Sequence, residues 1–543
     1  MGCSRRSVQL RAPWRGQLGL HHHQWLTAST LLFSKNWYRE GVVPLRMMML
    51  EEPRSGEAQG IADRSPYVSF PPGAVVPVYL LARVTGQEPS ASSIMALGLA
   101  NQLGILLLLA ATALVSLRAL GVSGVWRLVL GGVPPFLYLY APAPFYFHQN
   151  VYFADQAVIL PFALVLFLEA RRMAGRTSTA ADVAMAGALF WGAFTDWLFL
   201  PIAASLWLVR LFGGDLGRGL AQIVRRSAIL FAPVVLALGL FAVQLVAAGQ
   251  LDTLSGRFGV VAGLGGGVPP SFGELAYAVF VTQVDSGYGS SALVAIAVGI
   301  ALAVFLVTRL LGSSSAEASG EREGADRLTG VALVVRLLVL ATLPCVIYAM
   351  VVPIHTVGHD FSALKLGPTL ALGPFCLIPA AVVRFAERSF SAPRLRWVLV
   401  LPVAVALWHF SAADRRSSFP EPWEALPELA AFFEEHVGWE DAVFSPDFVI
   451  RRHPPHLLAY TMKRVRVASS LRDVQAWAAE NSGHPGPFVL VSIDPDGPGV
   501  GAYAEALRVR EVGAIRWARL SRSELDRLMG AEPLPVRSPQ ALP

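Results

Sequence analysis

Long apolar segments alternate with short polar connections along most of this chain. A segment needs roughly 20 apolar residues to cross a bilayer as a helix. Eight segments of about this length are expected to span a membrane: 94–117, 127–147, 153–170, 227–248, 290–311, 331–352, 364–383 and 397–412. A further apolar segment, 181–209, is interrupted by Thr195-Asp196, which predicts two shorter helices that meet at a polar turn. The pattern therefore predicts a bundle of ten helices over residues 94–412.

A polar stretch of mixed character, residues 21–93, precedes these segments. Within it, residues 24–38 predict a short amphipathic helix lying in the membrane interface, because apolar side chains share one helical face: Leu26, Phe33 and Trp37. This helix is followed by an acidic connector, a break at Pro71-Pro72 and an apolar run that is too short to span a membrane. We expect residues 21–93 to form a large loop fixed at one face of the bundle, after an irregular N-terminus at 1–20.

The composition changes again after about residue 413. Helix-like and strand-like stretches alternate there: 421–435, 442–444, 465–468, 471–480 and 487–493. This alternation predicts a small α/β domain at 413–525, followed by a disordered tail rich in proline at 526–543.

The overall composition supports a polytopic α-helical membrane protein. Of the 543 residues, 54% are hydrophobic and only 15% are charged, and the mean hydropathy is +0.51. A soluble protein carries about 25% charged residues. The cysteines Cys3, Cys345 and Cys376 are scattered, so they predict neither a disulfide framework nor a metal site. We expect the chain to be surrounded by membrane lipid and not to bind nucleic acid.

The basic residues orient the helices. They occupy alternate connections: Arg118, Arg127, Arg171, Arg172, Arg176, Arg210, Arg218, Arg225, Arg226, Arg322, Arg327, Arg384, Arg388, Arg394 and Arg396. Lys and Arg are retained in the cytoplasm, so the opposite side receives the remaining polar segments: 21–93, 148–152, 195–196, 249–289, 355–362 and the domain after 413. We therefore expect a multi-pass protein of the bacterial inner (plasma) membrane, with its polar clusters and its C-terminal domain outside the cytoplasm.

This topology leaves the N-terminus unexplained. No apolar segment precedes residue 21 to carry the chain across the membrane, and four early arginines oppose translocation: Arg5, Arg6, Arg11 and Arg15. Either the N-terminus is translocated without an anchor, or the start is misassigned and a first helix is lost. We expect the second.

Candidate chemistry lies at the mouths of the helices on the outer side. Asp155, in HQNVYFADQAVILPF, stands where a helix becomes wholly apolar. An ionisable group at a membrane boundary is costly unless it is solvated or used, although an Asp at this place also caps a helix. His148 and Asn150 share its loop and are candidates for binding hydroxyl groups. Asp196 is either a catalytic or binding group or simply a turn residue.

A second candidate segment is IHTVGHDFSALKLGP, at the entrance of a late helix. Its polar residues are His355, His359, Asp360 and Lys365. Lys365 either meets a phosphate at the membrane interface or extends its ammonium group to water. The consecutive histidines His21 to His23 suggest a general base or substrate contact more than a metal, because adjacent histidines on a helix point to different faces.

The order and sidedness of these features resemble the GT-C superfamily of membrane glycosyltransferases. The nearest group is that of the bacterial protein O-mannosyltransferases and lipid A aminoarabinose transferases, and SPYVSFPPGAVVPVYLLARVTG is similar to that group's loop reading HPPL followed by an apolar helix. The resemblance covers residues 21–412. It implies transfer of a sugar from a polyprenyl-phosphate donor to a lipid, glycan or protein acceptor outside the cytoplasm.

The resemblance also implies roles for individual residues. Asp155 matches the family's second acidic position and Lys365 a contact to the lipid phosphate. The family's first acid has no clear match. The further candidates for the catalytic base are His21, His22 and His23, which stand where that acid is expected, and the acidic residues Glu51, Glu52 and Asp63. The chemistry is compatible with a divalent cation as well as with no cofactor.

Two other readings account for the same pattern. A transporter or flippase of lipid-linked sugars is expected to show two related halves with helices broken at the membrane midplane, and the sequence shows no such symmetry. A catalytically inactive relative that serves as an assembly subunit is consistent with the missing first acid.

Overall fold

The computed structural model divides the chain into two compact units. One, here the helical unit, comprises Met1–Gly16 and Val68–Phe419, and the other, here the mixed unit, comprises Gln17–Tyr67 and Pro420–Pro543. The predicted loop 21–93 is therefore shared between the units and divides after Tyr67. The structure describes residues 18, 23–55, 60–217, 219–263, 269–290, 292–294, 296–297, 322–378, 380, 403–405, 407–408, 425–438, 440–445, 454–468, 470–482, 484, 487–492, 510–512 and 515–530.

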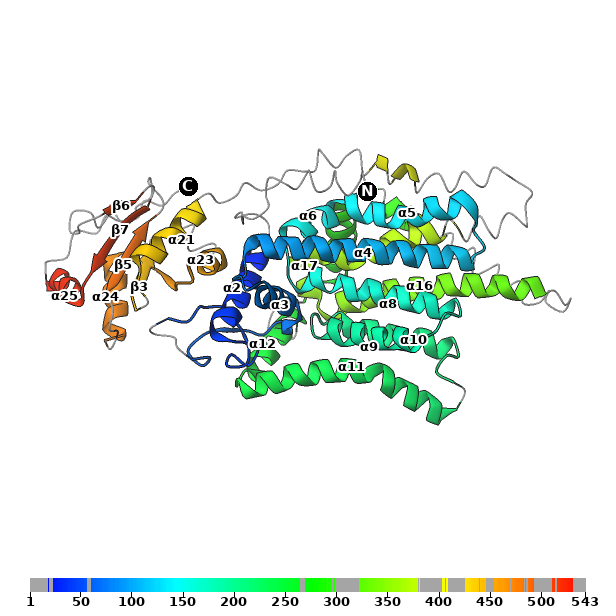
Figure 1. Cartoon of the computed structure of the whole chain (residues 1–543), viewed down its shortest axis with the longest axis horizontal. Coiled ribbons are helices and arrows are strands. Elements are labelled where there is room, and N and C mark those ends of the chain that lie inside the picture. Colours follow the sequence, from blue (N-terminus) through cyan, green and yellow to red (C-terminus); the bar gives the residue numbers. More distant parts are fainter. Residues whose placement is uncertain are drawn as a thin grey trace. The chain divides into compact units, whose positions relative to one another are not determined.

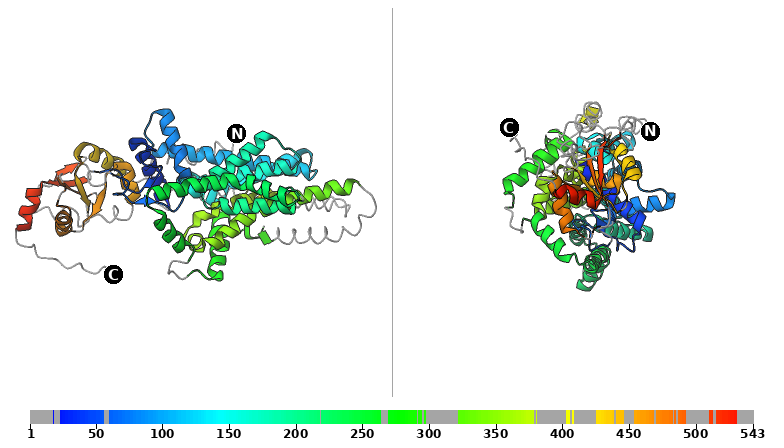
Figure 2. Two further views of the ribbon diagram at one scale, coloured as in Figure 1. Left: turned by 90° about the horizontal axis from the view of Figure 1, so that it is seen from below. Right: turned by 90° about the vertical axis from the view of Figure 1, so that its left-hand side faces the viewer.

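The helical unit consists of helices that run roughly along one direction (Figures 1 and 2). The longer ones are α3 (Val75–Thr85), α4 (Ala91–Ala119), α5 (Gly124–Tyr140), α6 (Pro142–Asn150), α8 (Ile159–Met173), α9 (Thr179–Ala193), α10 (Phe199–Phe212), α11 (Leu220–Ala247), α12 (Leu251–Val261), α16 (Arg322–Val351) and α18 (Ala363–Leu372). Short elements join them: η2 (Pro72–Ala74), α7 (Ala154–Ala157), α13 (Phe272–Tyr277), η3 (Ala278–Asp285), α14 (Ser286–Tyr288), α17 (Pro353–Gly358), η5 (Asp360–Ser362) and η6 (Gly373–Leu377). The helix α4 packs on α5 and α8, and α10 packs on α16.

Among the described residues, fewer helices are long and apolar enough to span than the ten predicted for the whole sequence. Within the described ranges, α4, α11 and the Ala332–Val351 part of α16 are long and apolar enough, and α5 with α6, bent by 61°, makes a fourth if the pair is one span. The segment 153–170 is divided at Val158 into α7, which carries Asp155, and α8, which keeps only 15 residues. The two helices predicted on either side of Thr195-Asp196 are present as α9 and α10. Most of 290–311 and 397–412 lies outside the described residues.

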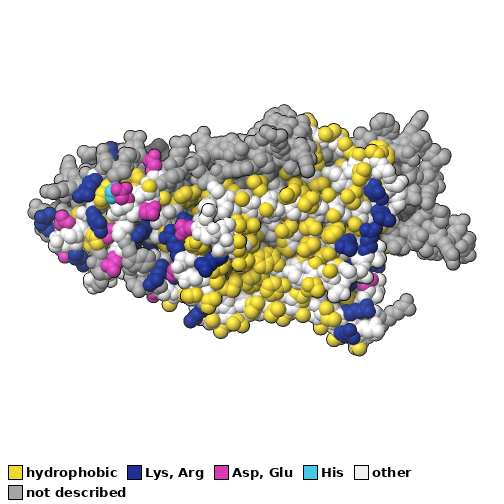
Figure 3. Space-filling model, viewed as in Figure 1, with side chains coloured by type: hydrophobic (Ala, Val, Ile, Leu, Met, Phe, Trp, Pro, Cys, Tyr) yellow, Lys and Arg dark blue, Asp and Glu magenta, His cyan; other side chains and the backbone are white. Residues whose placement is uncertain are grey.

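The surface of the helical unit fits a lipid environment. Large apolar side chains are exposed along α4 and α11: Leu103, Leu107, Val235, Leu236, Leu240 and Val243. Figure 3 shows this apolar surface over the helices, with Lys and Arg gathered at one end of them. Apolar patches of this extent are unfavourable in water and mark a surface that contacts lipid or protein.

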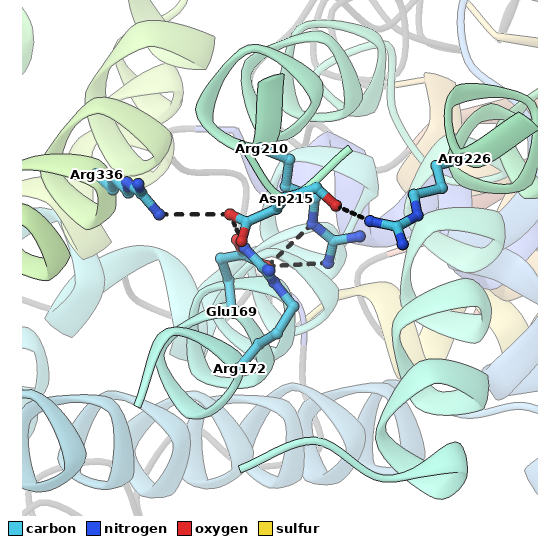
Figure 4. Close-up of polar contacts among 6 residues, drawn as sticks. All are labelled: Glu169, Arg172, Arg210, Asp215, Arg226 and Arg336. Atoms are coloured by element: carbon cyan, nitrogen blue, oxygen red, sulfur yellow. Dashed lines mark hydrogen bonds and ion pairs between the residues drawn. The ribbon is translucent and has the colours of Figure 1, made fainter. Parts of the chain in front are cut away.

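The charged end of the helices is an ordered network of ion pairs (Figure 4). Glu169, fully buried on α8, pairs with Arg210 of α10 at 2.9 Å and with Arg172 of its own helix. Asp215, in the loop after α10, pairs with Arg172 at 2.9 Å and with Arg336 of α16 at 3.3 Å. A guanidinium of α11, that of Arg226, donates to the backbone carbonyl of Asp215. Two connections predicted to share the cytoplasmic face thus meet at one place, together with Arg336 of the predicted segment 331–352.

The mixed unit contains a five-stranded sheet in the order β4-β3-β5-β7-β6. Its strands are β3 (Ala442–Ser445), β4 (Val465–Val467), β5 (Phe488–Ser492), β6 (Arg510–Val512) and β7 (Ile515–Leu520). The strands β4, β3 and β5 are parallel, and β5, β7 and β6 are antiparallel. The predicted stretches 442–444, 465–468, 471–480 and 487–493 correspond to β3, β4, the helix α24 (Leu471–Glu480) and β5.

Helices cover both faces of this sheet. Alternate residues of β3 face opposite sides, so Phe444 packs with α24 (Leu471–Glu480) and α25 (Arg522–Gly530), whereas Val443 packs with α21 (Ala425–His436) and α23 (Pro454–Thr461). Burial on both faces accounts for the continuous apolar runs of these strands.

The predicted helix at 24–38 is present as α2 (Gln24–Glu40), but its polar side is not exposed as an interfacial helix requires. It packs against α23. Asn36 Nδ2 donates to the carbonyl of Leu50 at 3.0 Å, and Lys35 Nζ donates to that of Ala459 at 2.9 Å. Its polar side chains therefore satisfy backbone groups of the mixed unit, which include the small pair β1 (Met49–Leu50) and β2 (Pro66–Tyr67). Helical periodicity alone does not distinguish a buried hydrogen-bonding side chain from one that faces water.

Candidate active site

Three ionisable side chains of the helical unit converge on one buried point. The ammonium group of Lys365 pairs with Asp155 Oδ1 and lies 3.2 Å from Asp196 Oδ2. Each of the three residues is at most 3% exposed. Because buried charges are stable only when they are paired, Lys365 is the reason that two carboxylates can share this place.

A break in a helix positions Asp155. Phe153 is fully extended, and the four-residue helix α7 that follows carries Asp155 in its first turn. Next to it, Gln156 Nε2 lies 2.7 Å from His148 Nδ1, and His148 Nε2 lies 2.7 Å from the Tyr138 hydroxyl. Asn101 of α4 donates to the backbone carbonyl of Gln156 at 3.1 Å. This buried network fixes α7 between α4, α5 and α6.

The turn between α9 and α10 positions Asp196. Its Oδ1 accepts a hydrogen bond from the N–H of Leu198 at 2.7 Å, as Asp does in turns, which leaves Oδ2 directed at Lys365. The Pro-Pro-Gly segment packs onto this turn, since the N–H of Gly73 donates to the carbonyl of Phe194 at 2.7 Å and Trp197 donates to that of Ser69 at 2.7 Å. A polar turn that the sequence places far from Asp155 is thus held beside it.

The first turn of α18 holds Lys365. Tyr348, at the end of α16, places its ring 3.9 Å from the ammonium nitrogen, a cation–π contact. The carbonyl of Lys365 accepts from Cys345 Sγ at 3.1 Å, and the Tyr288 hydroxyl donates to the carbonyl of Ala363 at 2.9 Å. The side chain therefore does not extend to the membrane surface.

Aromatic rings and one imidazole line the other side of Asp155. His355 Nε2 lies 3.7 Å from Asp155 Oδ1. The His355 ring contacts the rings of Phe70 at 5.9 Å and Phe361 at 5.8 Å. His355 is also 4.6 Å, ring to ring, from His359. These contacts bring residues of the Pro-Pro segment and of the late loop to the same carboxylate.

Asp155 retains an unused acceptor. Among the residues that the structure describes, none donates a hydrogen bond to Asp155 Oδ2, and the same holds for His355 Nε2. An ionised carboxylate has room for about four hydrogen bonds. A carboxylate that is kept charged by Lys365 and has a vacant oxygen can accept a proton from a bound hydroxyl group.

The structure thus brings together Asp155, Asp196, His355 and Lys365 of the residues predicted from sequence. His148 and Asn150 are buried close by, the first between Tyr138 and Gln156 and the second donating to the carbonyl of Tyr146. In the late loop, His359 stacks on Phe361 and Asp360 begins η5.

The remaining candidates for the base belong to the mixed unit. Asp63 is exposed and accepts a hydrogen bond from the N–H of Gly60 at 2.8 Å. His23 precedes α2 with a left-handed backbone, φ 61°. His22 lies outside the described residues.

Two contributors were not predicted from sequence. Tyr348 lies within an apolar segment, where an aromatic residue gives no sign of a polar neighbour. Gly73 lies so close to the Asp196 turn that a β-carbon would be 2.4 Å from the carbonyl oxygen of Phe194. The signal in the sequence is a glycine directly after Pro-Pro, since glycine allows close backbone approach.

Comparison with solved structures gives the fold. The oligosaccharyltransferase of Archaeoglobus fulgidus, in a complex with Zn and sulfate, aligns with a TM-score of 0.52 at 14% identity over 93% of this chain and 68% of its own. ArnT from Cupriavidus metallidurans bound to undecaprenyl phosphate aligns with a TM-score of 0.50 at 12% identity over 96% of this chain and 98% of its own. Both are GT-C superfamily glycosyltransferases. The resemblance stated from the sequence is confirmed at the level of the fold.

A second structure of the archaeal enzyme, AglB from Archaeoglobus fulgidus in complex with an inhibitory peptide and a dolichol-phosphate, also aligns with a TM-score of 0.50 at 11% identity, over 93% of this chain and 70% of its own. No protein-family model matches the chain, and no curated protein matches it by sequence.

Replacing Gly73 with Ala tests the packing that positions Asp196. The added methyl group would overlap the carbonyl of Phe194 and the Thr195 hydroxyl, so the turn must move. We expect a loss of about 1–3 kcal/mol in unfolding free energy, measured as a lower thermal midpoint of the purified protein in detergent.

The matched control is Gly187→Ala on α9, where a β-carbon meets nothing within 4 Å. Ala is favoured over Gly inside a helix, so this variant should be at least as stable as the wild type. Equal midpoints for the two variants would contradict the close approach at Gly73.

Proposed function

We propose that the chain is a membrane glycosyltransferase that moves a sugar from a polyprenyl-phosphate donor to a lipid, glycan or protein acceptor. The observation that carries the proposal is the buried Asp155, which is paired with Lys365 and has one oxygen without a donor among the described residues. It lies in a fold shared with glycosyltransferases whose structures contain lipid phosphates.

The proposed transfer reaction needs a carboxylate that can accept a proton. The acceptor oxygen attacks the anomeric carbon, the bond from that carbon to the phosphate oxygen breaks, and the hydroxyl proton passes to a base. In the proposal that base is Asp155, and Lys365 keeps it ionised until the proton arrives. Asp196 stabilises the ammonium group from its other side, and His355 borders the position of the acceptor.

Asp155 is preferred over the other candidate bases because of its surroundings. It is 3% exposed and held by a buried cation. Asp63 is exposed, and its oxygen is used to cap a turn. A group that works at the reacting atoms needs a fixed position and exclusion of bulk water, which favours Asp155.

The departing phosphate needs a cation other than Lys365, whose charge is already balanced by two carboxylates. Arg257 on α12 is exposed and contacts Ser69 Oγ at 3.3 Å. The next residue, Phe258, lies against Trp197, beside the Asp196 turn, with ring centroids 6.4 Å apart. We assign Arg257 the contact to the donor phosphate, for which a guanidinium is well suited.

The donor class and the side of the membrane are also part of the proposal. ArnT is bound to undecaprenyl phosphate in its structure and the archaeal enzyme is in complex with a dolichol-phosphate, which supports a polyprenyl-phosphate donor here. The basic network of Figure 4 supports a cytoplasmic location of that end of the helices. The site would then face the outside of a bacterial inner membrane, as would the C-terminal domain.

The described side chains do not fit a metal ion. The archaeal structure is a complex with Zn and sulfate, but in this chain the point between Asp155 and Asp196 is filled by the ammonium group of Lys365. No step of the proposed reaction uses a metal.

The substitution Asp155→Asn tests the catalytic assignment. We expect sugar transfer to native membrane acceptors, from a panel of labelled undecaprenyl-phosphate mannose, glucose and arabinose, to fall by a factor of about 10² or more, because the amide cannot take up the proton. The matched control is Asp252→Asn on α12, which removes an exposed carboxylate and should leave the rate unchanged.

Two results would count against this assignment. If Asp63→Asn abolishes transfer and Asp155→Asn does not, the base lies in the mixed unit. If the wild type transfers none of the three sugars and Asp155→Asn leaves binding of undecaprenyl phosphate unchanged, the reading as an inactive assembly subunit replaces the enzyme.

The substitution Arg257→Gln tests the phosphate contact. A hydrogen bond to a charged group contributes about 1.5–3 kcal/mol, so the dissociation constant for undecaprenyl phosphate should rise by about tenfold or more. Arg83→Gln on α3, which removes another exposed arginine, should bind as the wild type does. Unchanged binding by the Arg257 variant would remove this residue from the site.

A further inference from the structure

The ammonium group of Lys365 occupies a position that is chemically suited to a divalent cation. It lies between the carboxylates of Asp155 and Asp196, with His355 Nε2 beyond one of them at 3.7 Å from Asp155 Oδ1. We propose that Lys365 is a built-in replacement for a metal ion, so that the site excludes divalent cations and the protein works without them.

The first support is the balance of charge. Two carboxylates and one ammonium leave the cluster with a single formal negative charge. Because the ammonium already neutralises one of the two carboxylates and fills the place between them, an added divalent ion would meet one uncompensated negative charge and a like charge beside it, a much weaker attraction than two free carboxylates offer. The ion could enter only if Lys365 left.

The second support is that Lys365 cannot leave easily. It is 2% exposed, and the Tyr348 ring covers it at 3.9 Å from the ammonium nitrogen. Moving the ammonium group out of the cluster would place a charge among apolar side chains without a partner, which is strongly unfavourable.

The third support is the set of donors. Two carboxylates and an imidazole are ligands that Mn²⁺ and Zn²⁺ accept in proteins. Over the described ranges, no group of three His, Cys, Asp or Glu side chains is arranged to hold a metal ion. Groups that can ligate a metal ion are therefore present, but the space between them is occupied by the ammonium group of Lys365.

The inference has two parts that can fail separately. That Lys365 excludes a cation is a statement about binding and does not depend on what the protein does. That the reaction needs no metal rests on the proposed function. The experiment therefore measures binding, and transfer enters only as a second readout.

The experiment titrates the full-length protein in detergent with Mn²⁺ and follows the electron paramagnetic resonance signal of free Mn²⁺. Adding the wild-type protein should not reduce the signal of free Mn²⁺ below that of the same solution without protein. Lys365→Ala removes the charge and opens the space, so it should bind one equivalent of Mn²⁺ at least ~10-fold more tightly than the wild type, a change of about 1.4 kcal/mol. The double variant Lys365→Ala with Asp155→Asn should lose this binding.

The matched control is Lys365→Met, which removes the charge but fills the same space. It should not bind Mn²⁺, and it separates the loss of charge from the opening of a site. The wild-type measurement needs no variant, so it remains informative if a substitution prevents folding.

Two binding results would overturn the proposal. One is binding of Mn²⁺ by the wild type that Asp155→Asn removes. The other is a folded Lys365→Ala protein that binds no more tightly than the wild type. If binding behaves as expected but wild-type transfer stops with EDTA and returns with Mn²⁺, the exclusion at Lys365 stands and metal independence of the reaction is refuted.

Discussion

The contact of one ammonium group with two carboxylates is the interaction on which the proposed site depends. Neither Asp155 nor Asp196 could remain charged at this depth without Lys365. The three residues come from α7, the α9–α10 turn and α18, so their pairing also fixes how these elements pack. The same interaction therefore stabilises the bundle and keeps a proton acceptor ready.

The helical unit carries buried charge at both ends, and the two clusters differ in sign and use. At one end, Glu169 and Asp215 are surrounded by arginines that satisfy them, which leaves an excess of positive charge. At the other end, carboxylates outnumber the ammonium, and Asp155 Oδ2 has no donor among the described residues. A network with every carboxylate paired holds helices together, whereas a cluster with a vacant acceptor is suited to chemistry.

Much of the site could be predicted because polar residues within apolar segments are costly and therefore conspicuous. Asp155, Asp196 and Lys365 were found in this way, and the charge asymmetry of the connections placed them on one side. Their mutual contacts could not be predicted, because hydropathy gives the order of helices and not which of them are neighbours. Tyr348 gave no signal, since an aromatic residue is ordinary in an apolar segment.

The helix α2 was predicted with nearly correct bounds, but its environment was not: its polar side chains bind backbone carbonyls of the mixed unit. The predicted segment 153–170 is not one helix, since apolar length does not show that a helix is broken, as at Val158.

The claim that Asp155 and Lys365 act as one unit is tested most directly by a double-mutant cycle of the transfer rate. The four proteins are the wild type, Asp155→Asn, Lys365→Met and the double variant, each checked for folding and insertion. Residues that act as a unit are strongly non-additive, so the account predicts that each single variant loses most of the activity and that the double variant is no slower than Asp155→Asn alone. Losses that multiply, or a Lys365→Met protein that transfers sugar at the wild-type rate, would contradict it.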